Sequence, residues 1–164
     1  MRRILAFLLL LAAAAGAPAP AAEPVRLVLF PLEFVSTSME PVREDERARL
    51  RLAEAELRRR LEARGYLLLD PSPVAAQIGA YASLRECNGC ELELARALGA
   101  EQAALAWVGK TSNLILDITL RIGEVETGKL LRAGSVAIRG NTDESWLRGI
   151  RYLVDNVVFA ERRS

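Results

Sequence analysis

Residues 113–122 constrain the fold of this chain more than any other segment. Leucine or isoleucine occupies every even position from 114 to 122, and Ile115, Asp117, Thr119 and Arg121 lie between them. A repeat of two residues indicates a β-strand with one buried face and one wet face. A turn signal follows at residues 126–129, and residues 130–138 predict the returning strand of a hairpin. The C-terminal half of the chain is therefore expected to build an antiparallel sheet.

Helical and strand patterns alternate along the rest of the chain. Further strands are predicted at residues 25–30, 66–69 and 102–108, and helices at 43–64, weakly at 73–78, at 90–98 and from Asn141 onward. Asn141 is expected to cap the last helix, because Glu144 stands three residues later as in a capping box. Helical crossovers require parallel strands, whereas the last three strands favour an antiparallel meander. The sequence thus predicts an α/β (α+β) fold with a single mixed β-sheet, in the order β-α-β-α-β-β-β-α, and helices mainly on one face.

The N-terminus has the features of a secretory signal. Two arginines precede an apolar stretch at residues 4–11, and a small-x-small cleavage pattern follows at residues 19–21. We expect residues 1–21 to be removed and residues 22–164 to form a single periplasmic domain. The alternative is an uncleaved membrane anchor, for which the apolar stretch is short. No cysteine lies near the cleavage point, so a lipoprotein is not expected.

Missing residue types exclude several chemistries. The chain has no histidine, which removes Ser-His-Asp triads, Cys-His dyads and HExxH zinc sites. Covalent haem attachment needs a histidine directly after Cys-x-x-Cys, where Glu91 stands, and a Cys₄ zinc site would need two further cysteines. Removing the two arginines of the signal changes the net charge from +1 to −1. The mature chain therefore lacks the strongly basic charge that is typical of nucleic-acid-binding proteins. We therefore expect no metal and no cofactor.

Cys87 and Cys90 are the only cysteines, and they enclose the turn-forming dipeptide Asn88-Gly89 just before a predicted helix. In an oxidising compartment they are expected to form a disulfide. One hypothesis is a structural staple, worth about 2 kcal/mol for so small a ring. The other is a thiol–disulfide oxidoreductase with Cys87 as nucleophile and Cys90 as resolving thiol. A thioredoxin-like fold presents a proline from later in the chain, and every proline here precedes Cys87, which favours the staple.

Two segments resemble a known periplasmic architecture. Residues 90–101 (CELELARALGAE), followed by a strand, are similar to a helix-to-strand unit in modules related to the N-terminal domain of TolB. Residues 29–34 (LFPLEF) resemble the first strand of those modules. The curli secretion protein and the lipoprotein activators of penicillin-binding proteins share this general architecture. TolB-like modules bind other envelope proteins and are not catalysts, so the resemblance implies a binding role by analogy of fold.

A closer resemblance is to a family of bacterial secreted proteins of unknown function, of the DUF3280/DUF2380 type. It rests on residues 87–91 (CNGCE), 110–114 (KTSNL) and 139–146 (RGNTDESW). The family implies no established activity. Some members accompany periplasmic quinoprotein dehydrogenase systems, so the resemblance implies a partner of that kind.

The leading hypothesis is a non-catalytic exported adaptor that binds an envelope protein, and the alternative is the oxidoreductase. Residues 110–114 and 139–146 should lie close together if the meander forms. The candidate partner-binding residues are Lys110, Asn113, Arg139, Asn141, Asp143 and Trp146. These residues could instead be turn and cap residues, with Trp146 as an anchor of the core. No nucleic acid is expected as a partner, and no membrane span after signal cleavage.

Overall fold

The structure is a computed structural model that describes residues 23–38 and 40–160. The predicted signal segment, residues 1–21, lies outside the described residues. Among those described, no helix is both long enough and apolar enough to span a bilayer.

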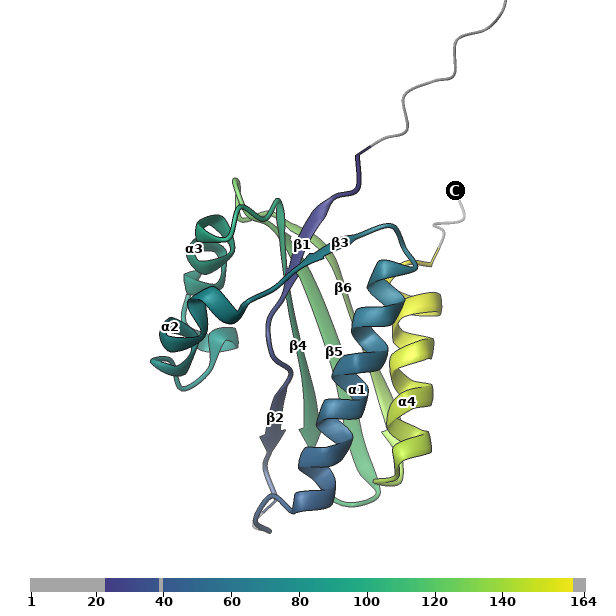
Figure 1. Cartoon of the computed structure of the whole chain (residues 1–164). Helices are drawn as coiled ribbons and strands as arrows, with labels where there is room; N and C mark the ends of the chain where they lie inside the picture. Colours follow the sequence, from purple (N-terminus) through teal and green to yellow (C-terminus); the bar gives the residue numbers. More distant parts are fainter. Residues whose placement is uncertain (1–22, 39, 161–164) are drawn as a thin grey trace, which may run out of the picture.

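A single mixed sheet forms the centre of the molecule, which confirms the predicted fold class (Figure 1). Its strands are β1 (Arg26–Leu29), β2 (Glu33–Ser36), β3 (Leu67–Leu69), β4 (Gln102–Lys110), β5 (Ile115–Glu124) and β6 (Leu130–Arg139). They are ordered β3-β1-β4-β5-β6, and β2 also pairs with β4. The pairs β1–β3, β1–β4 and β2–β4 are parallel, and β4–β5 and β5–β6 are antiparallel.

β1 and β2 both pair with β4, one after the other along its length. β1 pairs with the beginning of β4, at Gln102 to Ala104, and β2 pairs with its end, at Trp107 to Lys110. Pro31 lies between the two strands, where its missing N–H cannot continue the ladder. The strand predicted at residues 25–30 is therefore followed, after Pro31, by a second short strand that pairs with the other end of β4.

The two long helices lie side by side on one face of the sheet (Figure 1). They are α1 (Glu44–Glu62) and α4 (Asp143–Tyr152), and α4 continues as the π-helical segment η3 (Leu153–Val158). Their apolar side chains join those of the sheet in one core cluster, which includes the predicted strand positions Leu116, Ile118 and Leu120.

The shorter helices cover part of the opposite face. They are α2 (Ala75–Gly79) and α3 (Cys90–Ala97). The 3₁₀ turn η1 (Ser72–Val74) leads into α2, and η2 (Leu84–Glu86) lies between α2 and α3. A second core cluster joins them to β1 and β4, through residues such as Val28, Ala103 and Leu94. On this face α3 reaches β5 near Gly123, where Leu92 lies close to the strand.

The start of α4 differs from the prediction by one residue. Thr142, not Asn141, is the N-cap, and its hydroxyl oxygen accepts a hydrogen bond from the Ser145 amide at 3.2 Å. Thr142 has the extended backbone that an N-cap needs. The side chain of Asn141 is engaged elsewhere, in the polar cluster described next.

Candidate functional site

A buried ion pair lies at the end of the sheet where β4 stops and α1 begins. Lys110 is the last residue of β4, and its ammonium nitrogen lies 2.7 Å from Oε1 of Glu46 in the first turn of α1. The Lys110 side chain is 1% exposed and that of Glu46 is 0% exposed. Glu40, whose side chain is largely exposed, adds a second contact to the same nitrogen at 3.3 Å. A lysine placed this deeply needs its carboxylate partner, because an unpaired buried charge is strongly unfavourable.

Glu46 accepts further hydrogen bonds. The backbone amide of Arg43 donates to Oε2 at 2.9 Å, as in a capping box, and Nδ2 of Asn141 donates to Oε1 at 2.6 Å. Burial alone would raise the pKa of Glu46, but the bonds from Lys110, Arg43 and Asn141 outweigh it and hold the pKa below its usual value. The hydrogen bond to Glu46 likewise raises the pKa of Lys110, against the opposing effect of burial. Both groups are therefore charged at neutral pH.

Asn141 connects this pair to the rest of the cluster. Its amide nitrogen also donates to Oδ1 of Asn113 at 3.2 Å, and its amide oxygen accepts from Nε1 of Trp146 at 3.0 Å. Because both ends of the Asn141 amide are engaged, this side chain does not cap α4. We call Glu40, Glu46, Lys110, Asn113 and Asn141 the Lys110 cluster.

Most of the candidate partner-binding residues belong to this cluster or touch it. Asp143 joins through Arg49, whose Nε donates to the Asp143 carboxylate at 2.9 Å. Trp146 is buried, and its ring stacks on Phe34 of β2 with centroids 5.8 Å apart. The structure thus joins segments from β4, α1, the β4–β5 turn and the start of α4.

Burial changes the role that two of these candidates can have. Lys110 and Trp146 are enclosed by the fold, so their side chains support this end of the molecule from within and do not reach its surface. Asp143 and Arg139 are exposed, and Asn113 is half-buried. Asn141 is half-buried as well. These four members of the predicted set are the ones that can touch a partner directly, and their role in binding stays a prediction.

The surface beside the cluster includes apolar residues that the sequence pattern did not indicate. Leu114 is 71% exposed and Ile115 is 51% exposed, next to each other at the β4–β5 turn. An open hollow of ≈ 480 Å³ lies here, lined by Ser38, Glu40 and residues 111–114. Small-molecule pockets are commonly about 300–1,000 Å³, so the hollow falls within that range. Leu114 belongs to the alternating apolar set of residues 113–122, so its pattern predicted burial. Leu114 is exposed because β5 begins only at Ile115, so Leu114 lies in the preceding turn and not in the strand.

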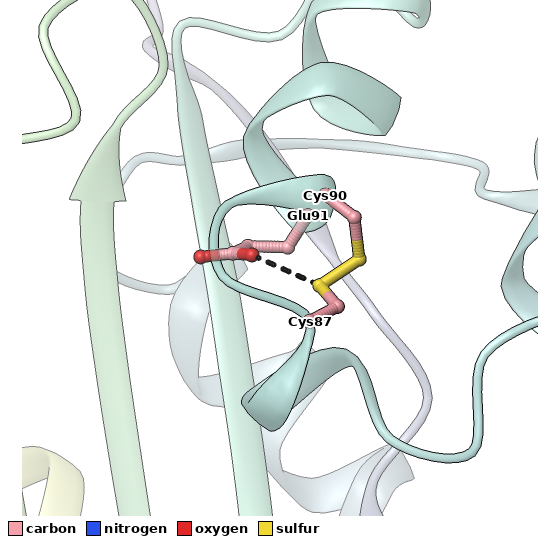
Figure 2. Close-up of side chains that lie close together, drawn as sticks. All are labelled: Cys87, Cys90 and Glu91. Atoms are coloured by element: carbon pink, nitrogen blue, oxygen red, sulfur yellow. Dashed lines mark hydrogen bonds between the residues drawn. A yellow bond between two sulfur atoms is a disulfide. The ribbon is translucent and has the colours of Figure 1, made fainter.

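The cysteines form the predicted disulfide at the entry to α3 (Figure 2). Cys90 is the first residue of α3, and the Cα atoms of Cys87 and Cys90 are 5.6 Å apart. Asn88 and Gly89 both have positive φ, of 58° and 105°, which is the left-handed backbone that this tight turn requires. The Asn-Gly dipeptide therefore does bring the two sulfurs together.

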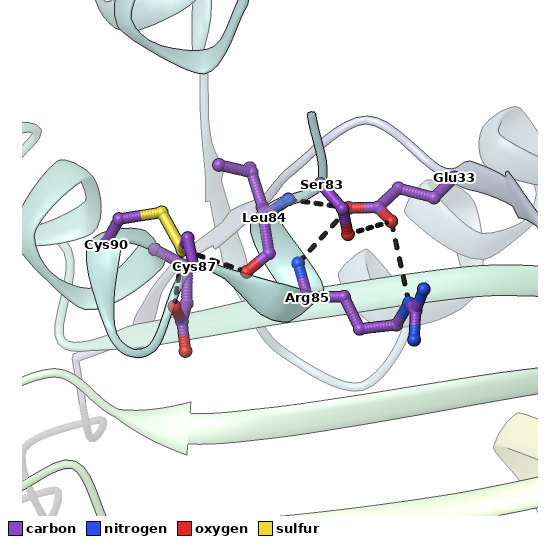
Figure 3. Close-up of a disulfide and its surroundings, with 7 residues drawn as sticks. Glu33, Ser83, Leu84, Arg85, Cys87 and Cys90 are labelled. Carbon is purple, nitrogen blue, oxygen red and sulfur yellow. Dashed lines mark hydrogen bonds and ion pairs between the residues drawn. A yellow bond between two sulfur atoms is a disulfide. The ribbon is translucent and has the colours of Figure 1, made fainter. Parts of the chain in front are cut away.

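β2 anchors the loop that leads to this disulfide (Figure 3). The Glu33 carboxylate accepts hydrogen bonds from the Ser83 hydroxyl at 2.7 Å and from the Leu84 amide at 2.9 Å. It also accepts from the Arg85 amide at 3.3 Å. A carboxylate at the N-terminus of η2 satisfies backbone donors that have no partner within the turn. The disulfide loop is thus fastened to the same strand that stacks Phe34 on Trp146.

The chemistry available at the disulfide is limited by its neighbours. Oε2 of Glu91 lies 3.5 Å from the sulfur of Cys87, and the carbonyl oxygen of Leu84 lies 3.1 Å from it (Figures 2 and 3). Cys87, Cys90 and Glu91 are the one group of metal-type ligands that gathers within residues 23–38 and 40–160. While the disulfide is formed, neither sulfur is a thiolate, and thiolates are what metal binding by cysteine requires.

Comparisons with solved structures relate the fold to bacterial proteins. The C-terminal domain of LpoB from Salmonella enterica matches with a TM-score of 0.51 and 16% identity, over 73% of this chain and 86% of that one. Lipoprotein GNA1162 from Neisseria meningitidis matches with a TM-score of 0.51 and 16% identity, over 73% of this chain and 84% of that one. At such identities the likeness concerns the fold alone. The specific comparison with TolB stays a prediction.

Comparison at the level of sequence gives the family. No curated protein matches the chain. The profile of the family DUF3280, described as "Protein of unknown function (DUF2380)", matches residues 25–158. This range includes every helix and strand of the structure, from β1 to η3. It confirms the resemblance drawn from the sequence motifs, and the chain belongs to this family of unknown function.

Proposed function

We propose that this protein is a non-catalytic, exported binding module that contacts an envelope protein with the end of the sheet where the Lys110 cluster lies. The observation that carries the proposal is the buried pair of Lys110 and Glu46 beneath an exposed surface. A buried ion pair often contributes little net stability compared with a well-packed apolar pair, so we infer that its role here is to fix the arrangement of the elements around it. Here those elements are the β4–β5 turn, α1 and the start of α4.

The surface above the cluster has the composition of a protein-binding site. Leu114 and Ile115 provide an exposed apolar centre, and Asn113 and Asp143 provide polar groups beside it. Interfaces combine an apolar core with a polar rim that forms hydrogen bonds. Because Asn113 is held by Asn141 and by Glu40, little of its side-chain freedom remains to be lost on binding.

Export is supported by the signal pattern at residues 1–21 and by the disulfide. Disulfides persist in oxidising compartments such as the periplasm. We accordingly propose that residues 22–164 act as one periplasmic domain and that the partner is a periplasmic or outer-membrane protein. A link to a quinoprotein dehydrogenase system follows from the family resemblance alone and stays a prediction.

Partner capture from the periplasm of the native host tests this function. A C-terminally tagged protein should retain a defined partner, and Leu114→Ser or Asp143→Ala should reduce its recovery while the protein stays folded. Leu67→Ser is the matched control, because Leu67 is an exposed leucine of β3 at the opposite end of the sheet. Equal recovery with all variants would refute the assignment of the surface, and accumulation of the protein in the cytoplasm would refute export.

A thiol–disulfide oxidoreductase remains the alternative, and the geometry weighs against it. The Glu91 carboxylate beside Cys87 disfavours the thiolate that nucleophilic exchange requires, and Cys90 is buried. A redox titration separates the two functions. A structural disulfide should have a reduction potential below about −300 mV, whereas an exchange-active pair should be more oxidising, about −270 to −120 mV.

A further inference from the structure

The outer side of β6 carries backbone groups without a partner. β6 pairs with β5 only, and within the described residues no strand lies on its other side. Arg139 is aligned with Ile115, but the backbone of Ile115 bonds to Ser112 and Thr111 within the turn. The carbonyl oxygen of Arg139 accepts instead from the Ser145 hydroxyl, at 2.9 Å. Two residues that face each other in an antiparallel ladder either exchange their backbone hydrogen bonds or both turn them away from the pair. Arg139 and Ile115 are of the second kind, so the N–H and C=O of Arg139 point away from β5.

The regular alternation of an antiparallel ladder extends this result along the strand. Residues two apart have the same orientation, so the N–H and C=O of Ala137, Ser135 and Ala133 also point outward. Their side chains are small, so they do not obstruct a strand that approaches this edge. The register shift in the β5–β6 ladder lies beyond them, at Ile122 and Gly123. The open edge is thus regular from Ala133 to Arg139, roughly 20 Å at about 3.3 Å per residue.

An apolar hollow and two arginines accompany this edge. A cavity of ≈ 350 Å³ lies between β6 and α4, and its lining includes Ala137, Arg139, Arg148 and Tyr152. Tyr152 is 57% exposed there. The lining contains two arginines and no carboxylate. Arg148 lies 3.2 Å from the Glu144 carboxylate on the surface of α4, but this exposed i,i+4 pair contributes little and can be exchanged for a partner's carboxylate. Arg132, further along β6, makes no ion pair with a carboxylate among the described residues, and it donates to the carbonyl oxygen of Val158.

We infer that β6 accepts an extended, acidic segment of a partner protein as an additional strand of the sheet. The outward backbone groups from Ala133 to Arg139 would form the ladder, apolar side chains of the segment would enter the hollow beside Tyr152, and its carboxylates would pair with Arg139 and Arg148. The inference deepens the proposed binding function, on which it rests, and names the chemistry of the partner.

Charge favours such a segment over a second copy of this chain. If two β6 strands paired with each other, Arg132, Arg139 and Arg148 of both copies would gather at one interface. Like charges on neighbouring strands are destabilising, whereas opposite charges add affinity and speed association. The complementary occupant is therefore acidic.

A peptide of defined sequence tests the inference on the full-length exported protein. We would measure the fluorescence anisotropy of a labelled peptide of about eight residues, alternating glutamate and valine, which matches the length of the open edge. The control peptide has lysine in place of glutamate. We expect the glutamate peptide to bind at least about tenfold more tightly than the lysine peptide, and less tightly at high salt.

Two variants separate strand addition from simple charge attraction. Ala137→Pro removes an outward N–H that takes no part in the ladder with β5, so the protein should keep its circular dichroism spectrum while peptide binding falls at least about tenfold. Arg148→Glu should weaken the glutamate peptide by a similar factor and strengthen the lysine peptide. Arg51→Glu, on the exposed surface of α1, is the charge-matched control and should leave both affinities unchanged.

Each other outcome overturns the inference in its own way. Unchanged binding by folded Ala137→Pro would show that the edge does not take up a strand. Equal affinity for both peptides would remove the acidic specificity. Dimerisation of the wild type in sedimentation experiments, lost in Ala137→Pro, would identify a second copy as the occupant. Partner capture that depends on Leu114 but not on Ala137 would support the proposed function and still refute this inference.

Discussion

Replacing Lys110 by methionine should be among the most damaging single changes in this protein. Methionine has a similar length, so the change removes a charge without opening a large cavity. It leaves the Glu46 carboxylate fully buried, with only the Arg43 amide and the Asn141 side chain as donors. Breaking one partner of a buried pair costs about 3–5 kcal/mol. A domain of this size has a free energy of unfolding of about 5–15 kcal/mol, so the variant should fold but melt roughly 10–20 °C lower.

The double variant Lys110→Met with Glu46→Gln supplies the matched control. Glutamine keeps an oxygen for the Arg43 amide and removes the buried negative charge. We expect the double variant to regain at least about 2 kcal/mol relative to the sum of the single changes, because coupled neighbours are not additive. Urea unfolding followed by tryptophan fluorescence measures all four proteins, and Trp146, which donates a hydrogen bond to Asn141 of the cluster, is one of the reporters.

Additive changes would refute this reasoning. If Lys110→Met cost less than about 1 kcal/mol and the two changes simply summed, the pair would be solvated and would not hold this end of the molecule. The proposed binding surface would then lose its rigid base.

Three further predictions concern packing, the disulfide and pH. Gly149→Ala would place a Cβ 2.6 Å from the side chain of Ile138 in β6. Despite the better helix propensity of alanine, this change should lower the free energy of unfolding by about 1–3 kcal/mol, as measured by thermal melts. Gly79→Ala is the control, because open space surrounds Gly79 and the protein should not lose stability. Replacing Cys87 and Cys90 together by serine should cost about 2 kcal/mol and speed amide exchange mainly in α3, whereas global unfolding would contradict a local staple. The pKa of Glu46 is lowered in the fold, so its contribution is complete above the unfolded value of about 4.3 and declines as the pH falls below it; Glu46→Gln should flatten the acid side of the stability profile measured by urea titration.

The sheet could be predicted because burial leaves a direct pattern in the sequence. Leu116, Ile118, Leu120 and Ile122 are all fully buried on one side of β5, and the period of two residues records this. The disulfide turn was also readable, since Asn88-Gly89 specifies a left-handed backbone by local chemistry alone. In both cases the decisive interaction is either periodic or confined to a few neighbouring residues.

The partners of Lys110 could not be predicted in this way. Glu46 is 64 residues away in sequence and stands in the first turn of α1, where an acidic residue is already explained by the helix dipole. Its burial arises only when α1 packs across the end of β4. For the same reason Asn141 appeared to be a cap: its local sequence fits one, and only the tertiary contact with Glu46 shows that its side chain is used elsewhere.

β2 explains how the disulfide and the Lys110 cluster can coexist without depending on each other. Glu33 at the start of β2 holds the backbone of η2, and Ser36 at its end pairs with Lys110 in β4. The contact from Glu33 is to backbone amides and not to the sulfur atoms, so opening the disulfide leaves it in place. The strand also carries Phe34, which stacks on Trp146 in the main core. Reduction of the disulfide should therefore loosen α3 on one face of the sheet. The proposed binding end, beside the last residue of β2, should keep its geometry. A partner whose capture is lost on reduction alone would have to contact α3 itself.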